Sequence, residues 1–211
     1  MFNIEKYNTI LKEIAVLRKK TQIIAVSKNH PIESVEEAIK HGVRIFGENR
    51  VQEAKSKFEQ LKKEYSKLEL HLTGPLQTNK VKEAINLFDV FHTLDREKLA
   101  KEFKKIGGLE NKKFFIQVNT GKEENKSGIY VEHLKQFVDY CSNELCLNVV
   151  GLMCIPPIND DPKKHFSFLS SEALKVNLSQ LSIGMSADYI DAINYNATYI
   201  RIGTSLFGKR L

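Results

Sequence analysis

Short apolar runs alternate along this chain with segments of helical periodicity. The runs are rich in Val, Ile and Phe, which favour β-strands. They predict eight strands, at residues 23–28, 43–48, 68–73, 90–94, 114–119, 147–154, 180–185 and 199–202. Between them, apolar side chains recur every three or four residues, the spacing of an amphipathic helix. That spacing predicts helices within residues 3–17, 31–42, 51–65, 81–88, 95–106, 131–141, 162–174 and 186–193.

Several predicted helices carry recognisable end signals. Asn3, Asp95 and Ser186 are residue types that cap helix N-termini, and each stands at the start of a predicted helix. Pro31 suits the start of the second helix, because the N–H that proline lacks has no intrahelical partner there. Gly107 and the glycine after it predict the end of the fifth helix.

The regular alternation predicts a parallel sheet with helical crossovers. Eight such units favour a single-domain (β/α)8 TIM barrel that occupies residues 1–211. An open doubly wound sheet is the alternative, but no G-x-G-x-x-G motif follows the first strand. No eighth crossover helix is evident after Phe207, so we expect the extra N-terminal helix to cover that side of the barrel.

Composition and charge narrow the functional classes. The 211 residues are 42% hydrophobic and carry a net charge of +6, with lysines interleaved with glutamates, which indicates a solvated surface more than a nucleic-acid site. No apolar run approaches the roughly 20 residues of a membrane span, and charge throughout the first twenty residues argues against a signal peptide. Three cysteines without C-x-x-C spacing fit reduced thiols. We expect a cytoplasmic protein that binds neither membrane nor nucleic acid.

The first strand ends on Lys28, and functional groups of such barrels gather at the C-terminal ends of the strands. A lysine that is desolvated there has a lowered pKa, and its amine becomes free to attack a carbonyl. The plainer interpretation of a single strand-end lysine is a solvated surface side chain.

The ends of the last two strands suggest an anion site. In barrels, phosphate is often held by the loops after strands seven and eight. Gly203 would let the backbone approach a ligand closely, and Ser186, Thr204 and Ser205 offer hydroxyl groups. A simple helix cap at Ser186 and a turn at Gly203 are the alternative. Strand alternation directs Arg201 to the same face as Gly203, and so into the barrel, where a cation needs a partner.

Strand eight neighbours strand one in a closed barrel, so Lys28, the anion loops and Arg201 would share one mouth. Pyridoxal 5′-phosphate (PLP) needs an amine for its aldehyde, a phosphate cup and a group that faces its pyridine nitrogen. Glu48 and Asn49 could contact the edge of the same ligand. We interpret His71 as a core or mouth residue rather than a metal ligand, because no H-x-x-x-H pair supports a metal site.

Segments spread over nearly the whole chain resemble those of the YggS/PROSC family of pyridoxal phosphate homeostasis proteins. The matching segments, in the family's order, are AVSK (25–28), FGENRVQE (46–53), GPLQTNK (74–80), IQVN (116–119), KSG (126–128), GLM (151–153), IGMSAD (183–188) and RIGTSLFG (201–208). This chain departs from the family's pattern at Arg50, where family members often have tyrosine. It also departs modestly in the segments that end at Ser186 and Gly74.

This resemblance implies a barrel similar to the N-terminal domain of bacterial alanine racemase. It implies PLP bound as an aldimine of Lys28, a phosphate cup that includes Ser186, Gly203 and Thr204, and Arg201 as the partner of the ring nitrogen. Asn49 belongs to a family motif near the cofactor. Members resemble carriers that affect vitamin B6 and amino-acid balance without an established reaction, so apo forms of PLP enzymes are possible recipients.

Racemisation requires acid–base groups on both faces of the substrate's α-carbon. Enzymes similar to alanine racemase draw one of them from a second domain, for which a chain that ends at Leu211 leaves no room. We therefore expect a monomeric PLP-binding protein without turnover. A PLP-dependent amino-acid racemase is the first alternative, and a barrel lyase that binds a sugar phosphate through Lys28 is the second. A nucleic-acid-binding module comes last.

Overall fold

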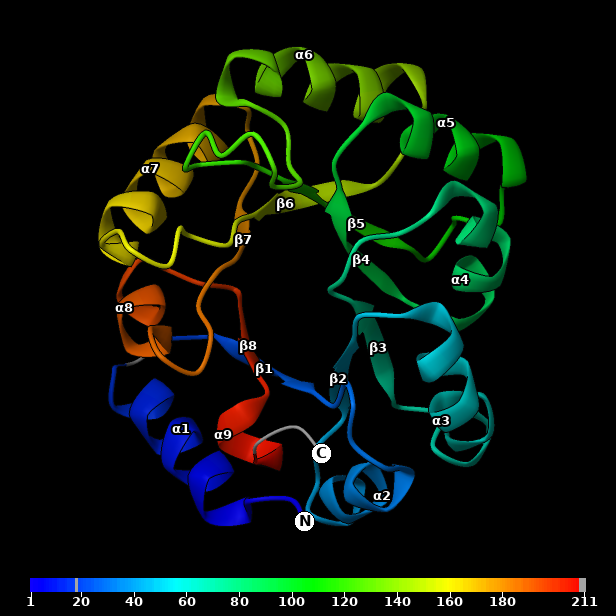
Figure 1. Ribbon diagram of the computed structural model, residues 1–211, viewed down its shortest axis with the longest axis vertical. Helices are drawn as coiled ribbons and strands as arrows, with labels where there is room; N and C mark the ends of the chain where they lie inside the picture. Colours follow the sequence, from blue (N-terminus) through cyan, green and yellow to red (C-terminus); the bar gives the residue numbers. More distant parts are fainter. Residues whose placement is uncertain (18, 209–211) are drawn as a thin grey trace.

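The computed structural model describes residues 1–17 and 19–208, which form a closed barrel of parallel strands surrounded by helices (Figure 1). The strands follow one another around the barrel in sequence order. They are β1 (Gln22–Val26), β2 (Ile45–Glu48), β3 (Glu69–Leu72), β4 (Val90–Leu94), β5 (Lys113–Gln117), β6 (Val149–Met153), β7 (Gln180–Ser182) and β8 (Tyr199–Ile202). The predicted (β/α)8 barrel is confirmed.

Helices cover the outside of this barrel and connect its strands. They are α1 (Ile4–Val16), α2 (Ile32–Lys40), α3 (Val51–Glu64), α4 (Val81–Leu87), α5 (Glu97–Ile106), α6 (Leu134–Asp139), α7 (Pro162–Lys175), α8 (Tyr189–Asn194) and α9 (Thr204–Phe207). Short 3-10 turns precede α4 and α6, and the π-helical residues Tyr140–Glu144 extend α6. Within the described part of the chain, no helix combines the length and apolar character needed to span a membrane.

The barrel closes through the pairing of β1 with β8. Gln22 lies opposite Tyr199, and Ile24 lies opposite Arg201. This parallel pairing joins the first strand to the last, which an open doubly wound sheet would keep apart. The C-terminal ends of β1 and β8 therefore lie side by side at one mouth.

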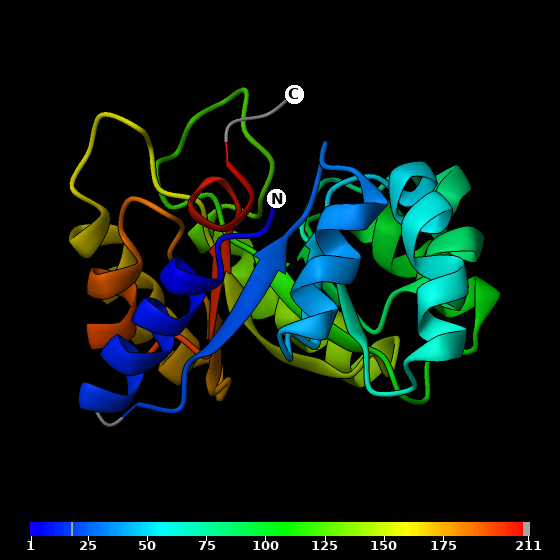
Figure 2. The same ribbon diagram turned by 90° about the horizontal axis from the view of Figure 1, so that it is seen from below.

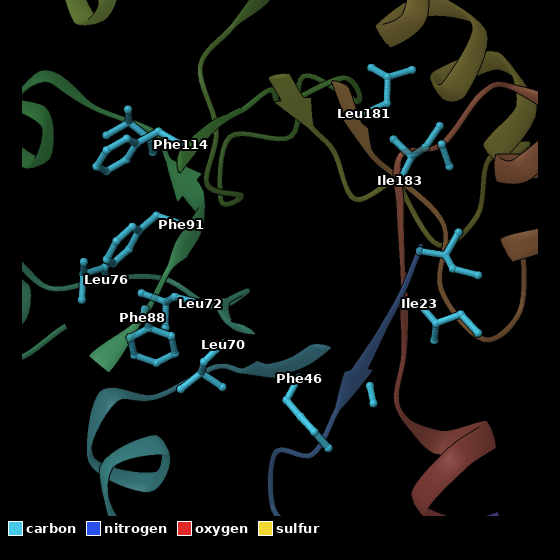
Figure 3. Packing of buried hydrophobic residues seen from close by; sticks show 14 of the residues in the cluster. Ile23, Phe46, Leu70, Leu72, Leu76, Phe88, Phe91, Phe114, Leu181 and Ile183 are labelled. Atoms are coloured by element: carbon cyan, nitrogen blue, oxygen red, sulfur yellow. The ribbon is translucent and has the colours of Figure 1, made fainter. Parts of the chain in front are cut away.

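Apolar side chains fill two layers, one on each face of the sheet. The outer layer lies between strands and helices, where Phe46 of β2 packs on Phe58 of α3 with ring centroids 5.5 Å apart. Figure 3 shows Phe46, Phe91 and Phe114 on this outward side of their strands. The inner layer is built from Ile24, Val26, Val90, Phe115, Met153 and Tyr199. Both faces of the strands are buried, which explains their near-continuous apolar character.

The extra N-terminal helix packs beside α8 and α9, as Figures 1 and 2 show, so its predicted position is confirmed. The Asn3 side chain accepts a hydrogen bond from the N–H of Lys6 at 2.9 Å, which confirms the predicted cap. The backbone N–H of Asn3 donates to the carbonyl of Leu206 in α9 at 2.7 Å. Residues Thr204–Phe207 thus form a single helical turn that the start of the chain holds in place.

Two predicted caps are wrong. Helix α5 begins at Glu97, and the Asp95 carboxylate accepts a hydrogen bond from Arg96 at 2.5 Å instead of capping the helix. Helix α8 begins at Tyr189, with Asp188 at its N-cap position, so Ser186 lies in the preceding turn. The residue type suits a cap in both cases, but α5 starts one residue later than predicted, and a turn at residues 186–188 precedes α8.

Strand β7 is also shorter than predicted, because it ends at Ser182 rather than at residue 185. Gly184 has a φ of +89°, in the left-handed region that favours glycine. The N–H of Met185 then donates to the Asp188 carboxylate at 2.6 Å. The same loop contacts β8, where the N–H of Arg201 donates to the Gly184 carbonyl at 2.9 Å.

Candidate functional site

The C-terminal ends of β1 and β8 lie side by side at the mouth of the barrel. Helix α9 and the loops after β5 and β6 lie on the same side (Figure 2). A Cβ atom added to Gly203 would lie 3.3 Å from the Val26 carbonyl oxygen and 3.6 Å from the Val26 Cβ. Lys28 stands two residues beyond Val26 and is half-buried. The predicted proximity of the Lys28 segment and the Gly203 loop is therefore confirmed.

The loops after β7 and β8 are joined directly. The N–H of Ser205 donates to Oγ of Ser186 at 3.4 Å. The N–H groups of Leu206 and Phe207 both donate to the Gly203 carbonyl at 2.9 Å, which holds the α9 turn against the end of β8. The loops that carry Ser186, Gly203 and Thr204 are consequently joined at one edge of the mouth.

Arg201 points into the barrel, as strand alternation predicts, and is 6% exposed. Its Nη1 donates to the carbonyl and to Oγ of Ser182, both at 2.7 Å, and its Nη2 donates to the Cys154 carbonyl at 2.9 Å. Burial lowers the pKa of Arg201, although guanidinium retains its proton in proteins. The sequence led us to expect an acidic partner or a ligand nitrogen; carbonyl and hydroxyl oxygens are the protein partners of the guanidinium, and the ligand nitrogen stays a prediction.

Asn49 is half-buried at the end of β2 and is fixed from two sides. Its Oδ1 accepts a hydrogen bond from Oγ1 of Thr73 at 2.9 Å. Gly74 packs so closely that an added Cβ would lie 2.4 Å from the Asn49 carbonyl oxygen. Asn49 also lines a cavity of about 690 Å³ that Arg50 and Gln77 share. Arg50 therefore faces this cavity beside the mouth.

A buried ion pair lies behind the Lys28 segment. Nζ of Lys57 on α3 is 2.6 Å from Oε1 of Glu48, and the same oxygen accepts a hydrogen bond from Ser27 Oγ at 2.7 Å. Lys57 also donates to the carbonyls of Ser27 and His30, at 2.8 and 3.2 Å. Glu53 accepts from Lys57 and from the N–H of Asn29. The residues on both sides of Lys28 are thereby held in place.

Glu48 does not occupy the position that the sequence suggested. Its carboxylate is fully buried towards α3 rather than at the edge of the mouth. Burial raises the pKa of Glu48, and the Lys57 cation counteracts that effect. Lys57 itself was missed, although one signal was available: it occupies the apolar face of α3 together with Ala54, Phe58 and Leu61.

His71 is a core residue, as expected, and is fully buried inside the barrel. Its Nδ1 lies 2.8 Å from Nε2 of His92, a contact that sequence reasoning did not foresee. Among residues 1–17 and 19–208, no group of three or more His, Cys, Asp or Glu side chains is arranged to hold a metal ion.

Comparison with known proteins agrees with this architecture. Residues 5–210 match the family described as "Alanine racemase, N-terminal domain". The chain is 40% identical to a pyridoxal phosphate homeostasis protein of Aquifex aeolicus, over 90% of this chain and 87% of that protein. It is 37% identical to the protein of the same name from Synechocystis, with both chains covered completely.

Solved structures give the same picture. PipY of Synechococcus elongatus, determined without PLP, is 37% identical and superposes with a TM-score of 0.83, covering 93% of this chain and 99% of PipY. PipY with PLP bound superposes with a TM-score of 0.82 at 35% identity, with the same coverage. Alanine racemase of Clostridium difficile, at 14% identity and a TM-score of 0.73, shares the fold across 97% of this chain and 56% of its own. This chain belongs to the alanine racemase N-terminal-domain family, and within it to the pyridoxal phosphate homeostasis proteins.

Proposed function

We propose that this chain binds PLP at the barrel mouth and takes part in vitamin B6 homeostasis. The observation that carries the proposal is the contact of Gly203 with Val26, two residues before Lys28. It brings the Lys28 segment close to the loop after β8, which carries the hydroxyl-bearing residues Thr204 and Ser205. The PLP-bound structure of PipY, at 35% identity, supports the same assignment.

The residues present fit the chemistry of PLP. Gly203 has no side chain to keep a ligand away from its backbone, and Ser186 and Thr204 in the two joined loops carry hydroxyl groups, a combination that suits a phosphate. Arg201 is held by three hydrogen bonds from its guanidinium and would face the pyridine nitrogen. Asn49 would contact the ligand's edge. When bound, PLP supplies an aldehyde and an electron-withdrawing ring.

Lys28 is the proposed attachment point. Strand β1 ends at Val26, two residues before the predicted end, and Lys28 stands in the turn that follows it at the mouth. The amine nitrogen would bond to the aldehyde carbon, and the aldehyde oxygen would leave as water. The Ser27–Glu48–Lys57 cluster fixes the backbone beside Lys28. The loop that carries Lys28 would therefore not need to rearrange when PLP binds.

We further propose that the ligand is carried rather than turned over. The curated relatives are named as homeostasis proteins. Racemisation needs a second acid–base group across the substrate, and the thiol nearest Arg201 is unsuited because burial raises the pKa of Cys154 to about 12. The proposed unit is a monomeric barrel of residues 1–211 that passes PLP to apo forms of PLP-dependent enzymes.

An absorbance spectrum of the purified protein with PLP tests the proposal. We expect a band near about 420 nm that borohydride abolishes, and a modified peptide that contains Lys28. Lys28→Ala should remove the band while circular dichroism stays unchanged. Lys80→Ala is the matched control, because Lys80 is a half-buried lysine of the neighbouring cavity that pairs with Glu83. Modification of another lysine would overturn the assignment, and production of D-isomers from L-amino acids would favour the racemase.

A further inference from the structure

A row of polar side chains crosses the otherwise apolar interior of the barrel. Oε1 of Glu69, at the start of β3, lies 2.7 Å from Nε2 of His71. Nδ1 of His71 lies 2.8 Å from Nε2 of His92, and Nδ1 of His92 lies 2.8 Å from Oγ of Ser182. The same Oγ accepts a hydrogen bond from Arg201 at 2.7 Å. Hydrogen-bonding contacts therefore run without a break from the bottom of the barrel to its mouth.

The surroundings keep water away from the two histidines. Both rings are fully buried. His92 stacks on Phe115, with centroids 4.6 Å apart and planes 6° from parallel. Tyr199 presents its edge to His71 and to His92, at 5.0 and 5.9 Å. Burial lowers the pKa of His71 and lowers that of His92 well below 6.5, so both rings are neutral near neutral pH.

Neutral rings fix the direction of every hydrogen bond in the row. A guanidinium only donates, so Ser182 Oγ accepts from Arg201 and its own proton is free for Nδ1 of His92. His92 then carries its proton on Nε2 and donates it to Nδ1 of His71. His71 likewise carries its proton on Nε2 and donates it to the Glu69 carboxylate. In the opposite direction both rings would carry their proton on Nδ1. The unprotonated Nε2 of His71 would then face the Glu69 carboxylate, and the Ser182 hydroxyl would not donate to His92.

Few charged groups act on this row from outside. Nζ of Lys113 lies 3.9 Å from Oε2 of Glu69, and Asp89 contributes at longer range to His71. Tyr199 stays neutral, because burial raises its pKa to about 12. The row thus joins a carboxylate at one end of the barrel to a guanidinium at the other, with aligned dipoles between them. In a low-dielectric interior, the hydrogen bonds of such a chain polarise and strengthen one another.

We propose that Glu69, His71, His92 and Ser182 form a one-directional hydrogen-bond chain that positions Arg201 at the cofactor site. They are positioning residues, since none of them would touch PLP. Their role towards the ligand rests on the proposed function, whereas the direction of the chain does not. Ser182 is the link, because its hydroxyl is the group that connects Arg201 to the histidines.

Nitrogen-15 NMR of histidine-labelled protein without PLP tests the direction of the chain. Two histidines should be neutral Nε2–H tautomers and should not titrate between about pH 5 and 8. His71→Gln and His92→Gln assign the signals. An Nδ1–H tautomer at either ring, or a protonated ring at neutral pH, would overturn the chain. This readout is valid whether or not PLP binds.

Ser182→Ala tests the positioning role. The variant keeps the 2.7 Å bond from Arg201 to the residue 182 carbonyl but cuts the link to His92. PLP should be retained through Lys28 with an affinity reduced roughly three- to ten-fold, and the His92 signal should shift. Ser170→Ala is the control, because its hydroxyl bonds to the Tyr195 carbonyl on the outside of the barrel. Unchanged PLP affinity in Ser182→Ala would refute the positioning role, while failure of the wild type to bind PLP would refute the proposed function instead.

Discussion

Lys57 on α3 and Glu48 at the end of β2 form a buried ion pair, with 2.6 Å between Nζ and Oε1. The side chain of Lys57 is 6% exposed and that of Glu48 is fully buried. The second carboxylate oxygen, Oε2, is buried without a hydrogen-bond partner among the described residues. Glu48 therefore depends on Lys57 and Ser27 for compensation of its charge.

Lys57→Met should destabilise the protein strongly, because it leaves the Glu48 charge buried without its cation. Breaking such a pair costs about 3–5 kcal/mol. Denaturant unfolding of the variant measures the loss. Adding Glu48→Gln should recover part of it, since the amide still accepts a hydrogen bond from Ser27 and carries no charge.

The exposed pair of Lys101 and Glu97 provides the control for this experiment. Lys101→Met removes a lysine from a helix surface and should change stability far less. Equal losses in Lys57→Met and Lys101→Met would show that the buried pair is not structurally important. A double variant no more stable than Lys57→Met would show that the uncompensated carboxylate is not the cause.

The fold was predictable because each strand is buried on both faces, so its residues form a nearly continuous apolar run in the sequence. The runs at β4 and β8 match the observed bounds in full. The mouth followed from topology alone: once β1 and β8 are neighbours, Lys28, Gly203 and Arg201 must gather there. Local signals failed where the helix began later than the capping residue type suggested, by one residue after Asp95 and after an extra turn at Ser186.

The supporting contacts could not be predicted, because they join residues that are distant in sequence. Ser182 and His92 are 90 positions apart and meet only across the closed barrel. Lys57 sits among apolar positions of α3, which is a usable signal, but nothing in the sequence identifies Glu48 as its partner. Alternation along β3 and β4 indicates that His71 and His92 face inward, yet their mutual contact depends on strand stagger.

Arg201→Ala should weaken PLP retention or shift the absorbance of the bound ligand. The guanidinium donates to the Ser182 and Cys154 carbonyls, and a charged hydrogen-bonding group of this kind is worth about ten-fold or more in affinity. Arg201→Lys should not restore binding, because an ammonium cannot span both carbonyls. Equilibrium dialysis with PLP measures the change.

Arg44→Ala is the matched control for Arg201→Ala. Arg44 also donates to two backbone carbonyls, those of Ile39 and Val43, but it precedes β2 at the opposite end of the barrel. Its loss should leave PLP retention and the spectrum unchanged. If Arg201→Ala behaves in the same way, Arg201 is only structural.

Gly203→Val should weaken binding of the phosphate in particular. The φ of Gly203 is −113°, so the backbone tolerates a side chain there. The new Cβ, however, would crowd the Val26 carbonyl at 3.3 Å and fill the space proposed for the phosphate. Affinities for PLP and for pyridoxal, which lacks the phosphate, distinguish the two effects. The preference for PLP should fall several-fold; an equal loss for both ligands would indicate general disruption of the mouth.

The buried histidines should make stability sensitive to mild acid. The folded-state pKa of His92 is lowered well below 6.5 because burial disfavours its charged form, and that of His71 is lowered for the same reason. Above pH 6.5 both states are neutral. As pH falls below 6.5, these histidines become protonated in the unfolded chain but stay neutral in the folded barrel, so the free energy of unfolding decreases. Each ring contributes up to about 1.4 kcal/mol per pH unit until its own folded pKa is reached.

Urea unfolding of the wild type and of His92→Gln across this range tests the dependence. The variant should lose stability less steeply below pH 6.5, whatever its stability at neutral pH. The difference between the two slopes removes the contribution of carboxylates, including Glu69, whose pKa the His71 hydrogen bond lowers. His133→Gln, at an exposed position, should keep the wild-type slope. Parallel curves for wild type and His92→Gln would mean that His92 is protonated inside the barrel, and the direction of the chain to Arg201 would then be wrong.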